Sequence, residues 1–193
     1  MKQGSGRGTG TKMAEVPADL TKLERLLQQA PSPTPDRVCA EIARILRVQH
    51  TEVALLRAEK EVLKFLFPSE LRAAGSIPLS SSAVAARTAV TKTSVLSNTF
   101  VKVKHVSLFE TVRLGLGESS NSLEPAPIQK LMSVPVQNGD NKVLGVIQIS
   151  RKGVDPNMVG PDFDMDDLRQ LEAIARIVAK LEFMENTPAT PAK

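Results

Sequence analysis

Basic side chains between Ala83 and Gly117 are the groups in this sequence best suited to bind a charged ligand. The segment holds five of them against a single acid, and its net charge of +4 equals that of the whole 193-residue chain. The five are Arg87, Lys92, Lys102, Lys104 and Arg113. If this segment covers a pocket, an anionic ligand is favoured, because desolvated cations pair with carboxylate or phosphate, and arginine binds such groups in bidentate fashion. The alternative is that these charges lie in solvated loops, as most charged side chains do.

Two polar residues of the same region are further candidates, and each has a structural alternative. His105 shares a helical stripe with Val101 and Leu108. One interpretation is a pocket residue or a haem axial ligand, and the alternative is a half-buried structural histidine. Asn98 either bonds a ligand or holds its own turn through its side chain. The candidate ligand-binding set is Arg87, Asn98, Lys104, His105, Phe109, Arg113 and the strand glycine Gly145.

Cysteine and histidine are too scarce to support redox or metal chemistry. Cys39 is the only cysteine, which excludes an internal disulfide, a CxxC pair and a multi-cysteine zinc site. His50 and His105, the two histidines, are far apart in the sequence, so a metal site has no support. The cofactor, if there is one, is not identified by these residues.

Composition restricts the setting and the partners of the chain. No apolar run reaches the roughly 18 residues that a membrane span requires, and the basic start leads into no apolar signal segment. We therefore expect a cytoplasmic protein without a membrane partner. Aromatic content is 3%, with no Trp or Tyr, so base-stacking platforms and hence nucleic acid are disfavoured.

Periodicity predicts one domain over residues 17–185, flanked by disordered tails at 1–16 and 186–193. The expected elements are helices over 18–29, from Thr34–Pro35 onward, over 81–89, near 103–113 and over 164–185, with hairpins over 51–68 and 133–150. We expect Ser80, Ser81 or Ser82 to cap the small helix at 81–89. The apolar band of the last helix is wider than one stripe, which indicates two burial partners: the sheet, and another helix or a second subunit.

The hairpin SVPVQNGDNKVLGVIQIS indicates a sheet that is covered on both sides. A two- or four-residue turn around Asn138–Gly139 places the following residues on one face: Val134, Val136, Val143, Gly145, Ile147 and Ile149. The other face then holds Pro135, Leu144, Val146, Gln148 and Ser150. Because the middle of the second strand is apolar on both faces, we expect helices on one side and the irregular segment 94–123 over a cavity on the other.

The order of these elements, together with six strings, resembles the GAF domain family over residues 34–184. The strings are VALL at 53–56, IPLSSSAVAARTA at 77–89, LSN at 96–98, LMSVPV at 131–136, KVLGVIQISRKG at 142–153 and FDMDDLRQLEAIARIVAKLE at 163–182. The last two, in that order and spacing, are the specific ones.

The resemblance implies an α+β fold with an antiparallel sheet of five or six strands. Helices from the two chain ends would pack on one face, and a ligand pocket roofed by connecting segments would lie on the other. GAF domains commonly bind small molecules such as cyclic nucleotides, haem, bilins or metabolites, and often form dimers through their terminal helices. Cys39 lies on the predicted N-terminal helix, which departs from bilin-binding members and from those that reduce free methionine sulfoxide. The NKxD pattern of cyclic-nucleotide-binding members is also absent.

We therefore expect a non-enzymatic sensory or regulatory module that binds a small molecule, favoured to be anionic. It would signal through a partner or through a homodimer made by helices 18–29 and 164–185. The alternative is a protein-interaction scaffold whose pocket is closed and vestigial.

Overall fold

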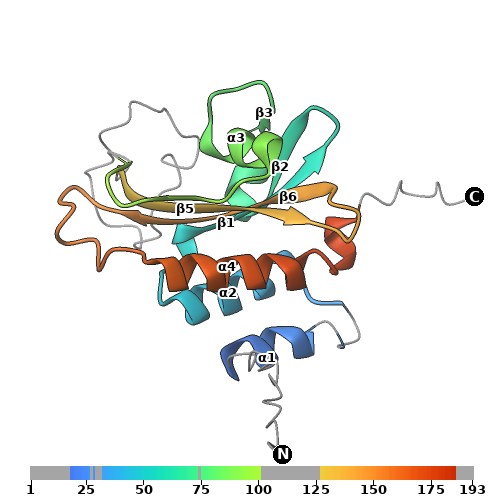
Figure 1. Cartoon of the computed structure of the whole chain (residues 1–193), viewed down its shortest axis with the longest axis horizontal. Helices are drawn as coiled ribbons and strands as arrows, with labels where there is room; N and C mark the ends of the chain where they lie inside the picture. The colour runs from blue at the N-terminus through green and yellow to red at the C-terminus, as the bar shows by residue number, and fades with distance from the viewer. Residues whose placement is uncertain (1–17, 27, 29–31, 74, 101–126, 186–193) are drawn as a thin grey trace, which may run out of the picture.

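The computed structural model describes residues 18–26, 28, 32–73, 75–100 and 127–185. These residues form an α+β fold in which helices flank a six-stranded antiparallel sheet (Figure 1). The elements in chain order are α1 (Ala18–Leu26), α2 (Pro35–Leu46), η1 (His50–Glu52), β1 (Val53–Glu59), β2 (Val62–Phe67), η2 (Ser69–Arg72), β3 (Ser76–Pro78), α3 (Val84–Thr91), β4 (Val95–Ser97), β5 (Ile128–Gln137), β6 (Val143–Lys152), α4 (Met165–Val178) and η5 (Glu182–Met184). The expected helix near 103–113 and both tails lie outside the described residues.

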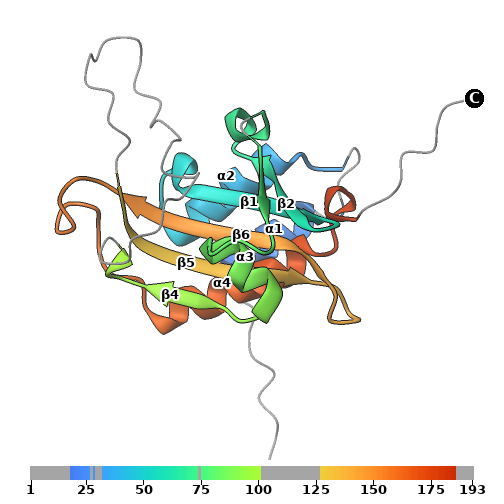
Figure 2. The ribbon, with the colours of Figure 1, turned by 90° about the horizontal axis from the view of Figure 1, so that it is seen from above.

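The strand order is β3-β2-β1-β6-β5-β4, so the long strands β1 and β6 lie at the centre of the sheet. Helices α2 and α4 cover one face, with α1 beneath them, and α3 lies on the opposite face (Figures 1 and 2). The sheet is therefore covered on both sides, as the alternation in the second hairpin predicted. All ten residues of β6 are at least half-buried.

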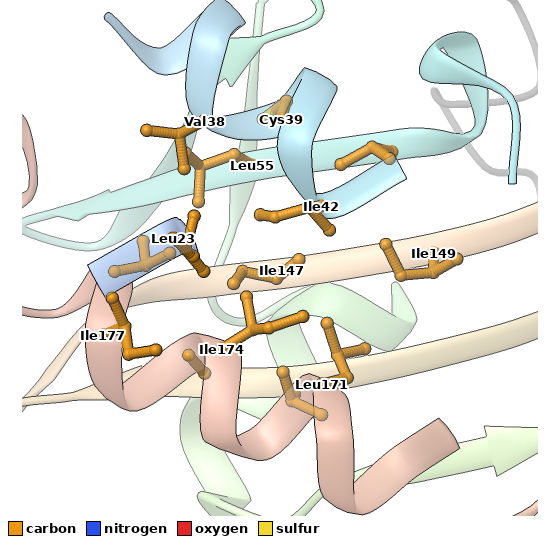
Figure 3. Packing of buried hydrophobic residues seen from close by; sticks show 14 of the residues in the cluster. Leu23, Val38, Cys39, Ile42, Leu55, Ile147, Ile149, Leu171, Ile174 and Ile177 are labelled. Carbon is orange, nitrogen blue, oxygen red and sulfur yellow. The ribbon is translucent and has the colours of Figure 1, made fainter. Parts of the chain in front are cut away.

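The face covered by α2 and α4, called the helix-covered face below, holds the larger part of the core. Side chains from α2 and α4 meet those of β1 and β6 in one continuous apolar layer (Figure 3). Ile42, Ile147 and Leu171 in this layer have no solvent-exposed surface. Leu23 of α1 packs on the same cluster, so the wide apolar band of α4 has both its burial partners, the sheet and α1 with α2, within this chain.

The two helices that carry this core begin at strong start signals. Thr34 caps α2 by accepting a hydrogen bond from the Arg37 backbone N–H (3.3 Å), with Pro35 at the first helical position as predicted. Asp164 caps α4, accepting from the N–H groups of Asp166 (2.8 Å) and Asp167 (2.9 Å). Carboxylates here favour the positive end of the helix dipole.

The prediction for the end of α4 was wrong. The helix ends at Val178 rather than near 185, and the chain turns into η5. Two contacts hold that turn: Arg57 Nη1 donates to the Phe183 carbonyl (3.1 Å), and Ser32 Oγ donates to Glu182 Oε2 (2.8 Å). Residues far away in the sequence thus stop a helix whose own residues carry no breaker.

The β5–β6 hairpin keeps the predicted faces along most of its length but not at the turn. Val136 pairs with Gly145 and Gln137 with Val143, so the connection has five residues and Leu144 is an extra residue in β6. This irregularity turns Val143 toward the α3 face and Leu144 toward the helices, the reverse of the expectation. The predicted two- or four-residue turn is therefore wrong.

Pro135 lies where β5 becomes an edge strand. β4 pairs only with Leu131, Met132 and Ser133, so the part of β5 that follows, including Pro135, has β6 on one side and no strand on the other. Proline is tolerated at such edges because its missing N–H costs no ladder hydrogen bond there. It also blocks pairing with another chain.

Candidate functional site

The α3 face of the sheet is the candidate site, and α3 approaches it closely. The helix contacts β5 and β6 through short side chains, among them the buried Ala85, Ala86 and Ala89. Larger apolar residues surround this contact and form a second core cluster, which includes Leu56, Phe65, Phe100, Ile128, Leu131 and Val146. A helix of small residues lets the backbone, or a ligand, lie near the strands.

A row of polar residues crosses the middle of this face. Gln148 of β6 pairs with Ala54 of β1 on one side and with Ser133 of β5 on the other. Thr88 of α3 reaches the same row, because its Oγ1 lies 2.8 Å from Ser133 Oγ. Thr88 and Ser133 are both fully buried and satisfy each other by this hydrogen bond.

Gln148 is the exception in this row. Its exposed fraction is only 6%, yet no residue in the described part of the chain donates to or accepts from its side-chain amide. The amide keeps some solvent-accessible surface. The fully enclosed side-chain atoms without a partner in the described chain are Thr51 Oγ1, Ser81 Oγ and Arg151 Nε, and the Gln148 amide is not among them. A buried amide normally has a partner in the protein or in water, because an unmade hydrogen bond is costly.

The polar groups at the next row are fully used by the fold. Ser150 Oγ donates to the Glu52 carbonyl (3.3 Å). The buried Glu52 carboxylate accepts from the backbone N–H groups of Gln49 (2.9 Å) and Lys152 (3.1 Å). These bonds join the start of β1 to the end of β6, which assigns Glu52 and Ser150 a structural role.

The serines before α3 do not cap it, contrary to the prediction. Ala83 occupies the cap position and makes no side-chain capping bond. Ser81 instead has its hydroxyl oxygen fully enclosed without a partner. A second unsatisfied polar group thus lies beside the helix that covers Gln148.

The predicted ligand-binding residues do not gather at this site. Lys104, His105, Phe109 and Arg113 lie outside the described residues. Arg87 is on α3 but exposed, on the side of the helix away from the sheet. The basic group that favoured an anion therefore contributes no described side chain to the polar row.

Asn98 uses its whole side chain to hold the protein's own backbone. Its Nδ2 donates to the Phe163 carbonyl (2.9 Å), and its Oδ1 accepts from the Phe163 N–H (3.0 Å). This pair joins the end of β4 to the segment that leads into α4. The position supports the structural alternative, although here the side chain holds a distant segment rather than its own turn.

Gly145 lies on the helix-covered face and not beside Gln148. A Cβ at this position would collide with the Leu56 carbonyl oxygen and would lie 2.6 Å from Met184 Cε. Met184 is buried in the core beneath the helices. The missing side chain therefore makes room for η5, and we assign Gly145 to packing.

Cys39 lies on α2 in the core of the opposite face (Figure 3). Burial, and secondarily the negative charge of Asp36, raises the pKa of its thiol far above the usual range. Such a thiol is protonated and inert, because the thiolate is the reactive form. The described residues also contain no group of three or more His, Cys, Asp or Glu that could hold a metal ion.

Two hollows outside the α3 face are lined in part by groups that already have partners. A groove of about 440 Å³ lies between α1 and the start of α4, where its aspartates, Asp164, Asp166 and Asp167, cap the helix or pair with Arg169. A smaller one of about 180 Å³ lies at the sheet edge beside Pro135, where Ser94 Oγ donates to Glu172 Oε1 (2.7 Å).

Comparison with known proteins identifies the family. The model of the GAF domain matches residues 34–181, most of the chain, and the chain belongs to the GAF domain family. No curated protein matches it.

Solved structures of the same fold are distant in sequence. The GAF domain of a phosphoenolpyruvate-protein phosphotransferase from Acinetobacter is 15% identical, covers 83% of this chain and 90% of its own, and has a TM-score of 0.56. The corresponding domain from Coxiella burnetii is 9% identical, with 83% and 90% coverage and a TM-score of 0.54. The free methionine sulfoxide reductase fRMsr of Staphylococcus aureus is 17% identical, with 83% and 92% coverage and a TM-score of 0.49. At these identities the two structures with a TM-score above 0.5 show the fold alone.

Sequence reasoning missed Gln148, Thr88 and Ser133 as site residues, although a signal for the first was present. The alternation of the hairpin placed Gln148 on the face opposite Val134 and Ile147, as the structure has it. A glutamine at a buried position in an otherwise apolar stretch of a central strand is unusual, and this marks Gln148 as a candidate site residue. Basic charge drew attention to Arg87 instead.

Proposed function

We propose that this GAF domain is a non-enzymatic sensory module that binds a small molecule on the α3 face, against Gln148. GAF domains are in general sensory or regulatory ligand-binding domains. The observation that carries the proposal is the Gln148 amide, which is nine-tenths buried at the centre of the sheet and has no partner among the described residues. A ligand that pairs with this amide would supply hydrogen bonds that the described residues do not.

The non-enzymatic part of the proposal is supported by the state of the single cysteine. Cys39 is buried on the other side of the sheet with a raised thiol pKa. Among the described residues, the polar row of the α3 face holds an amide and two hydroxyls that bond each other, with no base beside a nucleophile.

The described helices include none long and apolar enough to cross a membrane. We place the protein in the cytoplasm, signalling through a partner or its own assembly.

The second candidate function is a scaffold whose pocket is closed. It is favoured by the direct 2.8 Å contact between Thr88 and Ser133, which leaves no space between α3 and β5 at that point. In such a protein no ligand would pair with the Gln148 amide, which would bond only water or have no partner at all.

Gln148→Met, assayed with Gln129→Met as its matched control, separates the two functions. Gln129 is equally buried, at 5% exposed, but its Nε2 donates to the Gly153 carbonyl (2.7 Å). Without ligand, we expect Gln148→Met to raise the free energy of unfolding or leave it unchanged, and Gln129→Met to lower it by about 1–3 kcal/mol, because only the second leaves a carbonyl unpaired.

Ligand screening by thermal shift then decides the function, because a bound ligand stabilises the native state. If the protein is a sensor, at least one compound of a broad small-molecule set should raise its melting temperature, and the same compound should not raise that of Gln148→Met. A protein that gains nothing from any compound, and is simply more stable as Gln148→Met, is a scaffold and contradicts the proposal.

A further inference from the structure

The chemical class of the ligand follows from the groups that surround Gln148. We infer that the α3-face site recognises a neutral compound with an amide-type edge, a carboxamide or a lactam, and not an anion. This inference rests on the proposed function, and replaces the anionic ligand that the basic segment favoured.

The first step is the hydrogen-bonding capacity of Gln148 itself. A primary amide offers two donors on its nitrogen and an acceptor on its oxygen. A carboxamide or lactam presents the complementary pair, so two parallel hydrogen bonds satisfy both groups at once. A carboxylate has only acceptors and would leave the Gln148 oxygen without a donor.

The second step is the charge of the lining. The residues that the sheet register and α3 bring beside Gln148 are neutral: Ala54, Thr88, Ser133, Val146 and Ser150. The end of the strand carries Glu52 and Lys152, one charge of each sign, and the Glu52 carboxylate accepts from two backbone N–H groups. A buried anion needs a cation that pairs with it, and this lining adds no net positive charge.

Three other described cations of β5, β6 and the α3 region are engaged elsewhere. Lys130 Nζ donates to the Gly160 carbonyl (2.7 Å) and pairs with Asp162, and Arg151 lies over the Phe163 ring, which belongs to the opposite core. Lys92 Nζ donates to the Asn141 carbonyl (2.9 Å) at the sheet edge. An anion at Gln148 would therefore find none of these three beside it.

Matched compound pairs test the inference on the full chain. Each pair shares one skeleton and differs in the group offered: nicotinamide against nicotinate, and asparagine against aspartate. Titration calorimetry and thermal shift are run on the wild type, on Gln148→Met and on two controls. Gln170→Met changes a glutamine on α4 outside the site, and Arg87→Gln removes the exposed cation of α3.

The inference expects a neutral member of at least one pair to bind and its carboxylate partner to bind more weakly. Gln148→Met should weaken that binding by roughly 10- to 100-fold, the loss of one or two buried hydrogen bonds. Gln170→Met and Arg87→Gln should bind like the wild type.

Three results overturn the inference, and they are distinguishable from one another. Preferential binding of the carboxylates, weakened by Arg87→Gln, restores the anionic ligand while the proposed function stands. Neutral binding that is equal in Gln148→Met shows that Gln148 does not recognise the ligand. No binding by either class, with a more stable Gln148→Met, removes the proposed function as well.

Discussion

Gly145 and Gln148 lie on the same central strand and point to opposite faces, so they separate packing from recognition at the scale of single residues. Gly145 leaves space for Met184 on the helix-covered face. Gln148 presents an unpartnered amide on the α3 face. A change at the first should alter stability alone, and a change at the second should alter binding.

Gly145→Ala should lower the free energy of unfolding by about 1–3 kcal/mol, because the added methyl collides with the Leu56 carbonyl and with Met184. Denaturant unfolding measures this loss. Gly139→Ala is the control, since nothing lies within 4 Å of a Cβ there. Ligand response should survive in both variants. Equal stability of the two variants would show that the Gly145 notch does not position η5.

Cys39 predicts a pH dependence with a definite sign. Burial raises the pKa of its thiol, so above the unfolded-state pKa of about 8.5 the unfolded chain loses a proton that the folded chain keeps. Stability due to this group is therefore complete below that pH and falls above it, by up to about 1.4 kcal/mol per pH unit. Unfolding free energies of the wild type and Cys39→Ala should converge between neutral and alkaline pH. A constant difference would contradict the buried, protonated thiol.

Much of the residue-scale pattern could be predicted from sequence, but the site could not. Parity along the hairpin placed Gln148 on the correct face, and the pattern that begins at Thr34–Pro35 placed Cys39 on a helix, as the structure has it. What sequence could not supply was the inventory of partners, because whether an amide is satisfied depends on Thr88 and Ser133 from other elements. Asn98 is the opposite case, a residue predicted to be a candidate for ligand binding whose side chain is already satisfied by Phe163, which is distant in the chain.

At the scale of elements, tertiary contacts decide where helices and strands end. The starts of α2 at Thr34 and of α4 at Asp164 were predicted correctly, because a capping residue acts within one turn of its own helix. The end of α4 at Val178 depends on Arg57 and Ser32, which local sequence does not reveal. The extra residue Leu144 in β6 likewise follows from register with β5 rather than from the Asn138–Gly139 turn signal.

Asn98 joins two such elements, and its substitution should loosen that connection. Asn98→Asp keeps the acceptor for the Phe163 N–H but removes the donor to its carbonyl, whereas Asn98→Ala removes both. We expect losses of about 1–3 kcal/mol, larger for alanine. Hydrogen exchange should rise in residues 160–164 before α4. Unchanged stability with lost ligand binding would instead return Asn98 to the ligand site.

At the scale of the whole molecule, the homodimer through the terminal helices stays a prediction. The wide apolar band of the last helix left room for a second subunit as burial partner, but in the structure the sheet, α1 and α2 of the same chain cover it. A dimer through the terminal helices would therefore use their polar outer surfaces, which on α4 include Arg169 and Arg176. Sedimentation over a rising concentration series should show dimers that Arg176→Glu weakens. A monomer at high micromolar concentration would contradict the proposal.

The central claim is that a small molecule bonds the buried amide of Gln148, and the side-chain amide signal of that residue tests it most directly. In a ¹⁵N–¹H correlation spectrum the signal is identified by its absence in Gln148→Met. The account predicts that it shifts during titration with the neutral member of a matched pair, while the signal of Gln129, already bonded to Gly153, shifts less. A Gln148 signal that stays in place while other residues report binding would contradict the account.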